Sequence, residues 1–442
     1  MNDHTLDQAW SGASLLGFAF PTIMMMIFMG LYTITDTIFV SAFINTDALS
    51  ALNMVCPLVN ITVGLGTMIA AGGNGIVSRK LGAGQIQEAK EDFTLLIMAG
   101  ALIGFVILAA GILWMDEIIY GLGASQLLFP YCRDYLEVLF LFMPANIIQT
   151  LFSNLFVTAG KPGMGFGLSV LAGVTNIVLD YVFIVVCGLG IRGAALGTGC
   201  GYFVPAAAGT AFFAGSNHTL SFTKLKWRWK VLRESCINGS SEMISQLASA
   251  VTTFLFNITM MELLGETGVA AITILIYSQF MLNTLFMGFS MGVAPIIGFN
   301  YGSQNISRQK KVLQISIGFI AAASLLVFAG SMWGGPYIVR LFVSDTSEVY
   351  KIAAGGFSIF SYSFLFCGFN IFISALFTAL SNGIVSAALS FMRTFGLLAG
   401  GILLLPKFWG INGIWLAVPA AEGVMFVVSV LCLILCQKTY FR

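Results

Sequence analysis

The chain has 442 residues, of which 58% are hydrophobic and only 9% are charged, and its formal net charge is +1. Soluble domains carry about 25% charged residues, so this composition excludes a soluble globular protein and indicates an integral membrane protein. The near-zero net charge carries no information about partners.

The cysteines and histidines do not form the pattern of a metal or disulfide framework. The eight cysteines are scattered through apolar segments without a C-x-x-C motif, and the two histidines, His4 and His218, lie in polar segments. We interpret the cysteines as small core residues and expect no cofactor and no histidine-based metal site or triad. The first ten residues, MNDHTLDQAW, lack the basic region that opens a cleaved signal peptide.

The apolar segments predict an all-α protein that crosses the membrane many times. A helix needs about 20 apolar residues to span the hydrocarbon core, and longer segments are typical of tilted or bent helices. By this measure the sequence predicts twelve spans, over residues 14–43, 48–77, 93–113, 132–158, 163–187, 190–215, 236–262, 267–297, 312–334, 353–380, 383–405 and 410–437.

The distribution of lysine and arginine predicts the orientation. Most of the 20 basic residues fall in one set of alternate connections, few fall in the other set, and one, Arg393, lies within the eleventh span. The basic side of a membrane protein is cytoplasmic, so both termini are expected in the cytoplasm. We expect the protein in a prokaryotic cytoplasmic (inner) membrane.

The longest polar connection divides the chain into two six-helix lobes, residues 1–215 and 236–442, joined by a basic linker over residues 216–235. Its basic and aromatic residues could suggest a nucleic-acid or calmodulin-type target. We favour a cytoplasmic linker held near anionic lipid headgroups and expect no nucleic-acid partner.

The two lobes repeat each other with a constant shift of 220 residues. The shift superposes Gly72 on Gly292, Gly82 on Gly302, Lys90 on Lys310 and Gly190 on Gly410. Because each lobe has an even number of spans, the lobes must be parallel repeats related by an axis along the membrane normal. This architecture is typical of transporters, with substrate bound between the lobes.

No motif for nucleotide hydrolysis or membrane-embedded catalysis is present. The nearest approach to a P-loop, Ala159–Gly160–Lys161–Pro162, lacks the preceding glycine and the hydroxyl residue. The chain also contains no H-E-x-x-H or G-x-S-x-G. We therefore expect a transporter driven by an ion gradient rather than a pump or an enzyme.

The fifth predicted span carries the strongest candidate site. Asn176 and Asp180 are four residues apart in TNIVLDYVFI and share one face of a helix. A charged group inside lipid costs at least about 2.5–3.5 kcal/mol, so it favours a functional role, the alternative being a structural hydrogen bond between helices. At 1.5 Å per residue, Asp36 and Thr198 reach a similar depth in their own spans.

These four residues predict a cation site in the first lobe. Hard cations such as Na⁺ prefer oxygen ligands, by extension from Ca²⁺ and Mg²⁺, whereas two neighbouring carboxylates in a low dielectric would share a proton. Both chemistries stay open. The shift of 220 places Phe256, Gly396, Gly400 and Val418 at the equivalent positions, so the second lobe lacks the cluster.

The second lobe has three further charged candidates, Glu242, Arg393 and Glu422. Arg393 and Glu422 either form an internal ion pair or contribute charge to the substrate cleft. Glu242 either attracts cationic substrates or accepts a hydrogen bond from a neighbouring Ser or Gln. The abundant phenylalanines and methionines suit a cleft for varied apolar cations.

Over nearly its full length the chain resembles the multidrug and toxin extrusion (MATE) transporters. The matching segments are PTIMMMIFMGLYTITDTIFVS, Gly82–Ala83–Gly84, TNIVLDYVFI with GLGIRGAALGT, and GVAPIIGFNYG. The chain looks closest to the DinF-like branch, which the resemblance implies uses first-lobe carboxylates for H⁺ or Na⁺ coupling.

The resemblance also implies roles for individual residues. It implies that Asp36, Asn176, Asp180 and Thr198 hold the cation, that Tyr32 and Asn154 lie near it, and that Pro21 lets the first span bend. The NorM-like branch is associated with acidic residues in spans seven and ten. Glu242 could match the first of these, but residues 353–380 contain no Asp or Glu.

The sequence therefore predicts a monomeric twelve-helix antiporter that exports small organic, cationic and amphiphilic compounds in exchange for H⁺ or Na⁺ by alternating access. The alternative within the same superfamily is a lipid-linked oligosaccharide flippase, which would need a more cationic cleft than Arg393 alone supplies.

Overall fold

The computed structural model describes residues 6–215 and 219–440, so His4, His218 and the ends of the chain lie outside the described residues. The described chain is helical and contains no β-strand. The first lobe comprises α1 (Gly12–Phe43), α2 (Thr46–Gly82), α3 (Ile86–Leu113), α4 (Met115–Gly121), α5 (Phe129–Leu141), α6 (Met143–Thr158), α7 (Pro162–Asp180), the π-helix η1 (Tyr181–Val186) and α8 (Gly190–Ala214).

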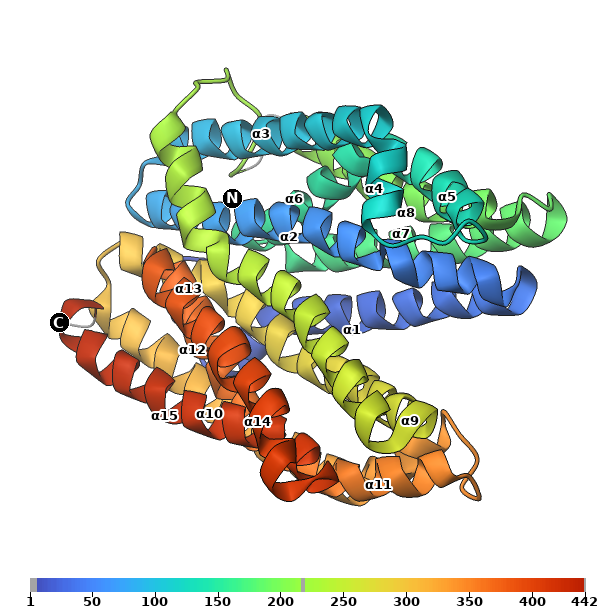
Figure 1. The fold of residues 1–442 in the computed structure, drawn as a ribbon. Coiled ribbons are helices and arrows are strands. Elements are labelled where there is room, and N and C mark those ends of the chain that lie inside the picture. Colours follow the sequence, from blue (N-terminus) through green and yellow to red (C-terminus); the bar gives the residue numbers. More distant parts are fainter. Residues whose placement is uncertain (1–5, 216–218, 441–442) are drawn as a thin grey trace.

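The second lobe follows the same order. It comprises α9 (Trp229–Gly302), α10 (Ile306–Arg340), α11 (Glu348–Phe360), the 3₁₀-helix η2 (Ser361–Ser363), α12 (Phe364–Ala379), α13 (Gly383–Phe391), the π-helix η3 (Met392–Leu398), α14 (Ala399–Trp409) and α15 (Ile411–Tyr440). Figure 1 shows the two lobes as separate groups of long helices, with α9 running from the first group into the second.

The described helices account for the twelve predicted spans. Among the described residues, nine continuous helical stretches are long and apolar enough to cross a membrane. Three of these stretches join neighbouring elements, namely α7 with η1, α11 with η2 and α12, and α13 with η3 and α14. In addition, α5 and α6 together form one span bent by 57°. The helix α9 contains two predicted spans, because its backbone leaves the helical region at Gly265 (φ 66°, ψ −151°). The remaining predicted span is α8. The sequence did not predict the break between α5 and α6 or the short helix α4.

The internal repeat is present in the backbone. With the shift of 220, the ends of α2 and α9 coincide at Gly82 and Gly302, and α3 and α10 both begin at the equivalent isoleucine. Gly190 and Gly410 have nearly the same left-handed backbone, with φ of 56° and 55°, a conformation that glycine adopts without steric cost. The order of spans is therefore equivalent in the two lobes.

The lobes meet through close backbone contacts on the predicted cytoplasmic side. A methyl group on Gly82 would overlap the carbonyl oxygen of Phe299, and one on Gly302 would overlap that of Arg79. The shift of 220 converts the first contact into the second, so a pseudo-two-fold axis passes between them. Figure 1 shows the lobes close together at this end and spread apart at the opposite end.

The basic linker is attached to the first lobe by ion pairs. Lys226 Nζ lies 2.5 Å from Glu91 Oε1, and Arg228 pairs with both Glu91 and Asp92. Lys80 Nζ lies 2.6 Å from the fully buried carboxylate of Asp92. These pairs give Lys226 and Arg228 protein partners in place of the lipid headgroups expected from the sequence. They also explain why α3 begins seven residues before the predicted apolar span.

Candidate cation site in the first lobe

Glycines on α8 bring α7 close enough to form the site. Gly193, Gly197 and Gly201 recur every four residues, so they lie on one face of the helix. A methyl group on Gly197 would overlap Oδ1 of Asp180, and one on Gly201 would lie 3.3 Å from Cβ of Asn176. Small residues at this spacing let membrane helices approach closely, so α8 positions both polar side chains of α7.

The backbone changes its helical type directly after Asp180. Helix α7 ends at this residue, and the next six residues form the π-helix η1. A π-helical turn contains more residues than an α-helical turn, so the side chains after Asp180 are rotated relative to the face that carries Asn176. Such turns are frequent at functional sites.

The four predicted residues form one buried cluster whose oxygen atoms lack partners. Asp180 is fully buried and Asn176 is 2% exposed, and the carboxylates of Asp36 and Asp180 are direct neighbours. Among the described residues, no group hydrogen-bonds to either carboxylate oxygen of Asp180, or to the buried oxygens listed here: Asp36 Oδ1, Asn176 Oδ1 and Thr198 Oγ1. A buried acceptor without a donor costs about 1–3 kcal/mol. A bound proton or metal cation would relieve this cost.

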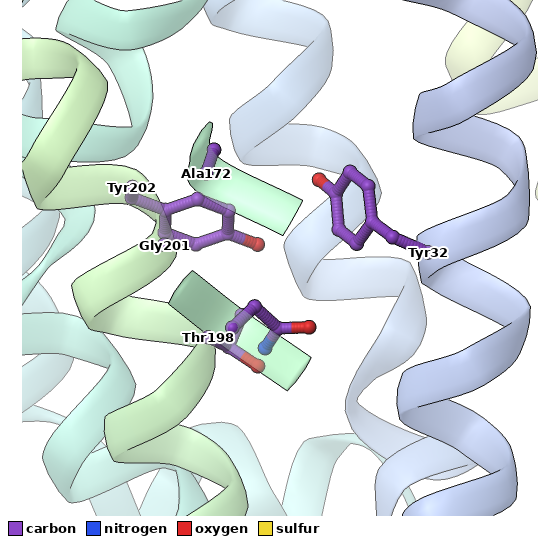
Figure 2. Close-up of a pocket in the computed structure, with 6 residues that line it drawn as sticks. Tyr32, Ala172, Thr198, Gly201 and Tyr202 are labelled. Atoms are coloured by element: carbon purple, nitrogen blue, oxygen red, sulfur yellow. The ribbon is translucent and has the colours of Figure 1, made fainter. Parts of the chain in front are cut away.

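A small cavity adjoins the cluster and is drawn in Figure 2. It is lined by residues of α1, α7 and α8, namely Tyr32, Ala172, Asn176, Thr198, Gly201 and Tyr202, and it has room for about one water molecule or one unhydrated cation. Figure 2 shows the hydroxyl oxygens of Tyr32 and Tyr202 pointing into the space between α1 and α8. The cavity thus presents phenol, hydroxyl and amide groups beside the carboxylates.

Two tyrosines of this site were missed by sequence reasoning. Tyr202 is four residues after Thr198, so helical spacing could have identified it. Tyr135, on α5, is buried within electrostatic reach of Asp36, Asp180 and Thr198. Nothing in the local sequence links Tyr135 to the other residues, because only the packing of α5 against α8 brings it there.

The structure also shows the surroundings of Asn154, Pro21 and Glu242. Asn154 is not among the residues that line the cavity, and its Nδ2 donates to the carbonyl of Thr150 at 3.2 Å in its own helix. Pro21 lies within α1, which continues without interruption from Gly12 to Phe43. The serines on either side of Glu242 donate elsewhere, Ser240 to the carbonyl of Ile237 and Ser245 to that of Ser241, so neither supplies the hydrogen bond that was one alternative for Glu242.

The charged residues Arg393 and Glu422 of the second lobe form the internal ion pair that was one of the two alternatives. Arg393 Nε and an Nη atom donate to Glu422 Oε1 at 2.9 and 2.6 Å. Asn370 Nδ2 donates to Oε2 at 2.7 Å. Both carboxylate oxygens therefore have partners, in contrast to those of Asp180.

Comparison with known proteins gives a consistent family match. A family model described as MatE matches residues 21–182 and 243–399. The multidrug export protein MepA of Staphylococcus haemolyticus is 24% identical over 405 residues, covering 91% of this chain and 87% of that protein. MepA of Staphylococcus saprophyticus is 22% identical, with the same coverage.

Solved structures share the fold. An outward-facing multidrug resistance MATE family transporter of the MOP superfamily has a TM-score of 0.92 at 20% identity, covering 100% of this chain and 98% of that chain. A mutant of the Vibrio cholerae MATE transporter VcmN has a TM-score of 0.89 at 20% identity, covering 98% of each chain. These matches confirm the predicted fold of twelve helices in two lobes.

Proposed function

Because the chain belongs to the MatE family, whose members are transporters and not enzymes, we propose that it exports small organic compounds in exchange for H⁺ or Na⁺. The family and the apolar helices make it an integral protein of the bacterial cytoplasmic membrane. The MepA relatives are named as multidrug export proteins, which supports a broad range of substrates for this chain.

The coupling cation binds at Asp36, Asn176, Asp180 and Thr198. The observation that carries this assignment is the set of buried oxygen atoms in these side chains, which have no donor among the described residues. Two adjacent carboxylates with an amide and a hydroxyl suit either a shared proton or a small hard cation. Such a first-lobe site is also what the DinF-like branch implies.

Helix α1 provides a physical link between the cation site and the lobe interface. It packs against both α7 and α9, and it carries Asp36 near one end and Ala19 near the other. A methyl group on Gly292 of α9 would lie 3.0 Å from the Cα of Ala19. Cation binding between Asp36 and Asp180 would therefore shift α1 relative to α7 of its own lobe and to α9 of the second lobe.

Exchange follows if the cation and the substrate stabilise opposite facing states. A ligand shifts a conformational equilibrium only by its difference in affinity for the two states, and the coupling between two ligands is reciprocal. Cation release would then accompany substrate loading from the cytoplasm. We propose that a monomer performs this cycle, because both lobes and the close contacts between them belong to one chain.

Cationic, amphiphilic compounds are the substrates that the composition favours. The chain contains 39 phenylalanines and 20 methionines, which offer cation–π and adaptable sulfur contacts. The rival function, a lipid-linked oligosaccharide flippase, would need free cationic groups for the phosphates. Arg393 is engaged by Glu422, so this arginine does not support that rival.

The proposal is tested by transport in proteoliposomes under an imposed pH gradient and, separately, an imposed Na⁺ gradient. We expect efflux of a fluorescent organic cation with one of the two gradients and none without a gradient. Equal transport in the absence of both gradients would contradict ion coupling.

A further inference from the structure

The ion pair between Arg393 and Glu422 occupies a defined place in the internal repeat. With the shift of 220, Glu422 is the equivalent of Tyr202 and Arg393 is the equivalent of Gly173. Tyr202 lines the small cavity beside the cation cluster, and Gly173 directly follows Ala172, which also lines it. The charged pair therefore lies where the second lobe would have its counterpart of that cavity.

The surrounding helices support this equivalence. A methyl group on Gly193 would lie 2.9 Å from the backbone of Phe183, and one on Gly413 would lie 2.4 Å from the backbone of Leu405, two residues beyond the equivalent of Phe183. The two lobes thus have a similar close helix crossing, offset by two residues along one helix. Each lobe also has a π-helix in this span, and η3, which contains Arg393, begins nine residues before the position equivalent to the start of η1.

The two equivalent places differ in how their oxygen atoms are satisfied. In the first lobe, the carboxylate of Asp180 has no donor among the described residues. In the second lobe, Glu422 receives two donors from Arg393 and one from Asn370. The positive charge that the first lobe must take from solution is supplied in the second lobe by a side chain.

We infer that the guanidinium of Arg393 is a tethered cation that supplies, beside the second-lobe counterpart of the cavity, the positive charge that the exchangeable cation supplies in the first lobe. This inference rests on the proposed first-lobe site. It implies one exchangeable coupling site per chain and a latent second site at Glu422 and Asn370. Asn370 is 3% exposed and its Oδ1 has no hydrogen-bond partner among the described residues, so it could serve a small cation together with the carboxylate.

The neighbouring groups limit what else could take the charge. Within the described residues, Cys367 of α12 is the other titratable side chain that interacts electrostatically with this pair. Its Sγ lies 3.3 Å from Asn283 Oδ1, to which it donates. Removing the guanidinium would therefore leave Glu422 dependent on a proton or a cation from solution.

The test uses the full chain carrying Asp36→Asn and Asp180→Asn, so that first-lobe binding does not contribute. In this background, thermal unfolding of Arg393→Gln is compared in NaCl and in N-methyl-D-glucamine chloride, each at pH 5.5 and pH 8. We expect a lower Tm than that of the parent, and a rise in Tm with Na⁺ or at the lower pH. Arg393→Lys, and Arg393→Gln combined with Glu422→Gln, should show no such response.

A Tm of Arg393→Gln that is unaffected by both Na⁺ and pH would overturn the inference, as would the same response in the variant that also lacks Glu422. If Arg393→Gln does not fold, the unmutated chain is treated with dicyclohexylcarbodiimide, which adds to protonated carboxyl groups, and labelled residues are identified by mass spectrometry. We expect Glu422 to stay unlabelled. Labelling of Glu422 would overturn the inference, whereas absence of label at Asp36 and Asp180 would count only against a shared proton there.

Discussion

Gly197 of α8 lies so close to the carboxylate of Asp180 on α7 that no side chain could be added without displacing it. We expect Gly197→Ala to cost about 1–3 kcal/mol, as overpacking does, and to reduce gradient-driven efflux by moving Asp180. Efflux from proteoliposomes and Tm in detergent are the measurements. Gly167→Ala on α7 is the control, since no heavy atom lies within 4 Å of the added methyl group. Equal efflux in the two variants would contradict the packing role.

Asp36→Asn and Asp180→Asn should each abolish ion-driven efflux of a fluorescent cation while the protein still inserts into the membrane. The physical reason is that an amide carries no charge to attract Na⁺ and no proton to exchange. Transport in vesicles is the measurement, with Asp134→Asn as the control. Asp134 lies in an exposed pair with Arg192, which contributes about 0–1 kcal/mol. Gradient-driven efflux in both first-lobe variants would refute the coupling model.

Glu242→Gln should change the substrate profile more than the driving ion. We expect the carboxyl group of Glu242 to attract cationic substrates in the cytoplasmic half of the first span of α9. Efflux of a cationic and a neutral dye is compared under the same gradient, and only the cationic dye should be transported more slowly. Glu262→Gln, at an exposed position of the same helix, is the control. Loss of all ion dependence would move the coupling site to the second lobe.

Gly302→Ala should open the cytoplasmic contact between the lobes. The added methyl group would overlap the carbonyl oxygen of Arg79, so the variant must separate α2 from α9 at their ends. Hydrogen exchange followed by mass spectrometry should detect faster exchange near residues 76–82 and 296–302. Gly318→Ala, which meets no atom within 4 Å, should leave exchange unchanged. If Gly302→Ala does the same, the contact does not hold the lobes together.

Asp92→Asn should destabilise the fold by about 1.5–3 kcal/mol, the contribution of hydrogen bonds to charged groups, because Lys80 and Arg228 lose their fully buried carboxylate and keep only Glu88 and Glu91. Asp92 is fully buried and pairs with Lys80 and Arg228. Glu88→Gln is the control, since the Glu88 side chain is 47% exposed and its pair should contribute about 0–1 kcal/mol. Thermal unfolding in detergent distinguishes the two. Similar losses in both variants would show that burial does not set the strength of these pairs.

The sequence alone determined the features that depend on local pattern. Apolar length predicted the spans, with α9 divided near Gly265, and the constant shift of 220 predicted the equivalence of the lobes. Helical spacing placed Asn176 and Asp180 on one face, and depth added Asp36 and Thr198. These predictions succeeded because hydrophobic length, helical period and rise per residue act within a single segment.

Only the tertiary structure decided how distant segments meet. It paired Arg393 with Glu422, brought Tyr135 to the cation cluster and gave the linker residue Arg228 its partners on α3. It also placed Asn154 outside the cavity lining. A charged side chain has several possible partners at a given depth, and the choice among them depends on helix crossings set by contacts such as Gly197 against Asp180. Those contacts are distances between segments, which no single segment of sequence contains.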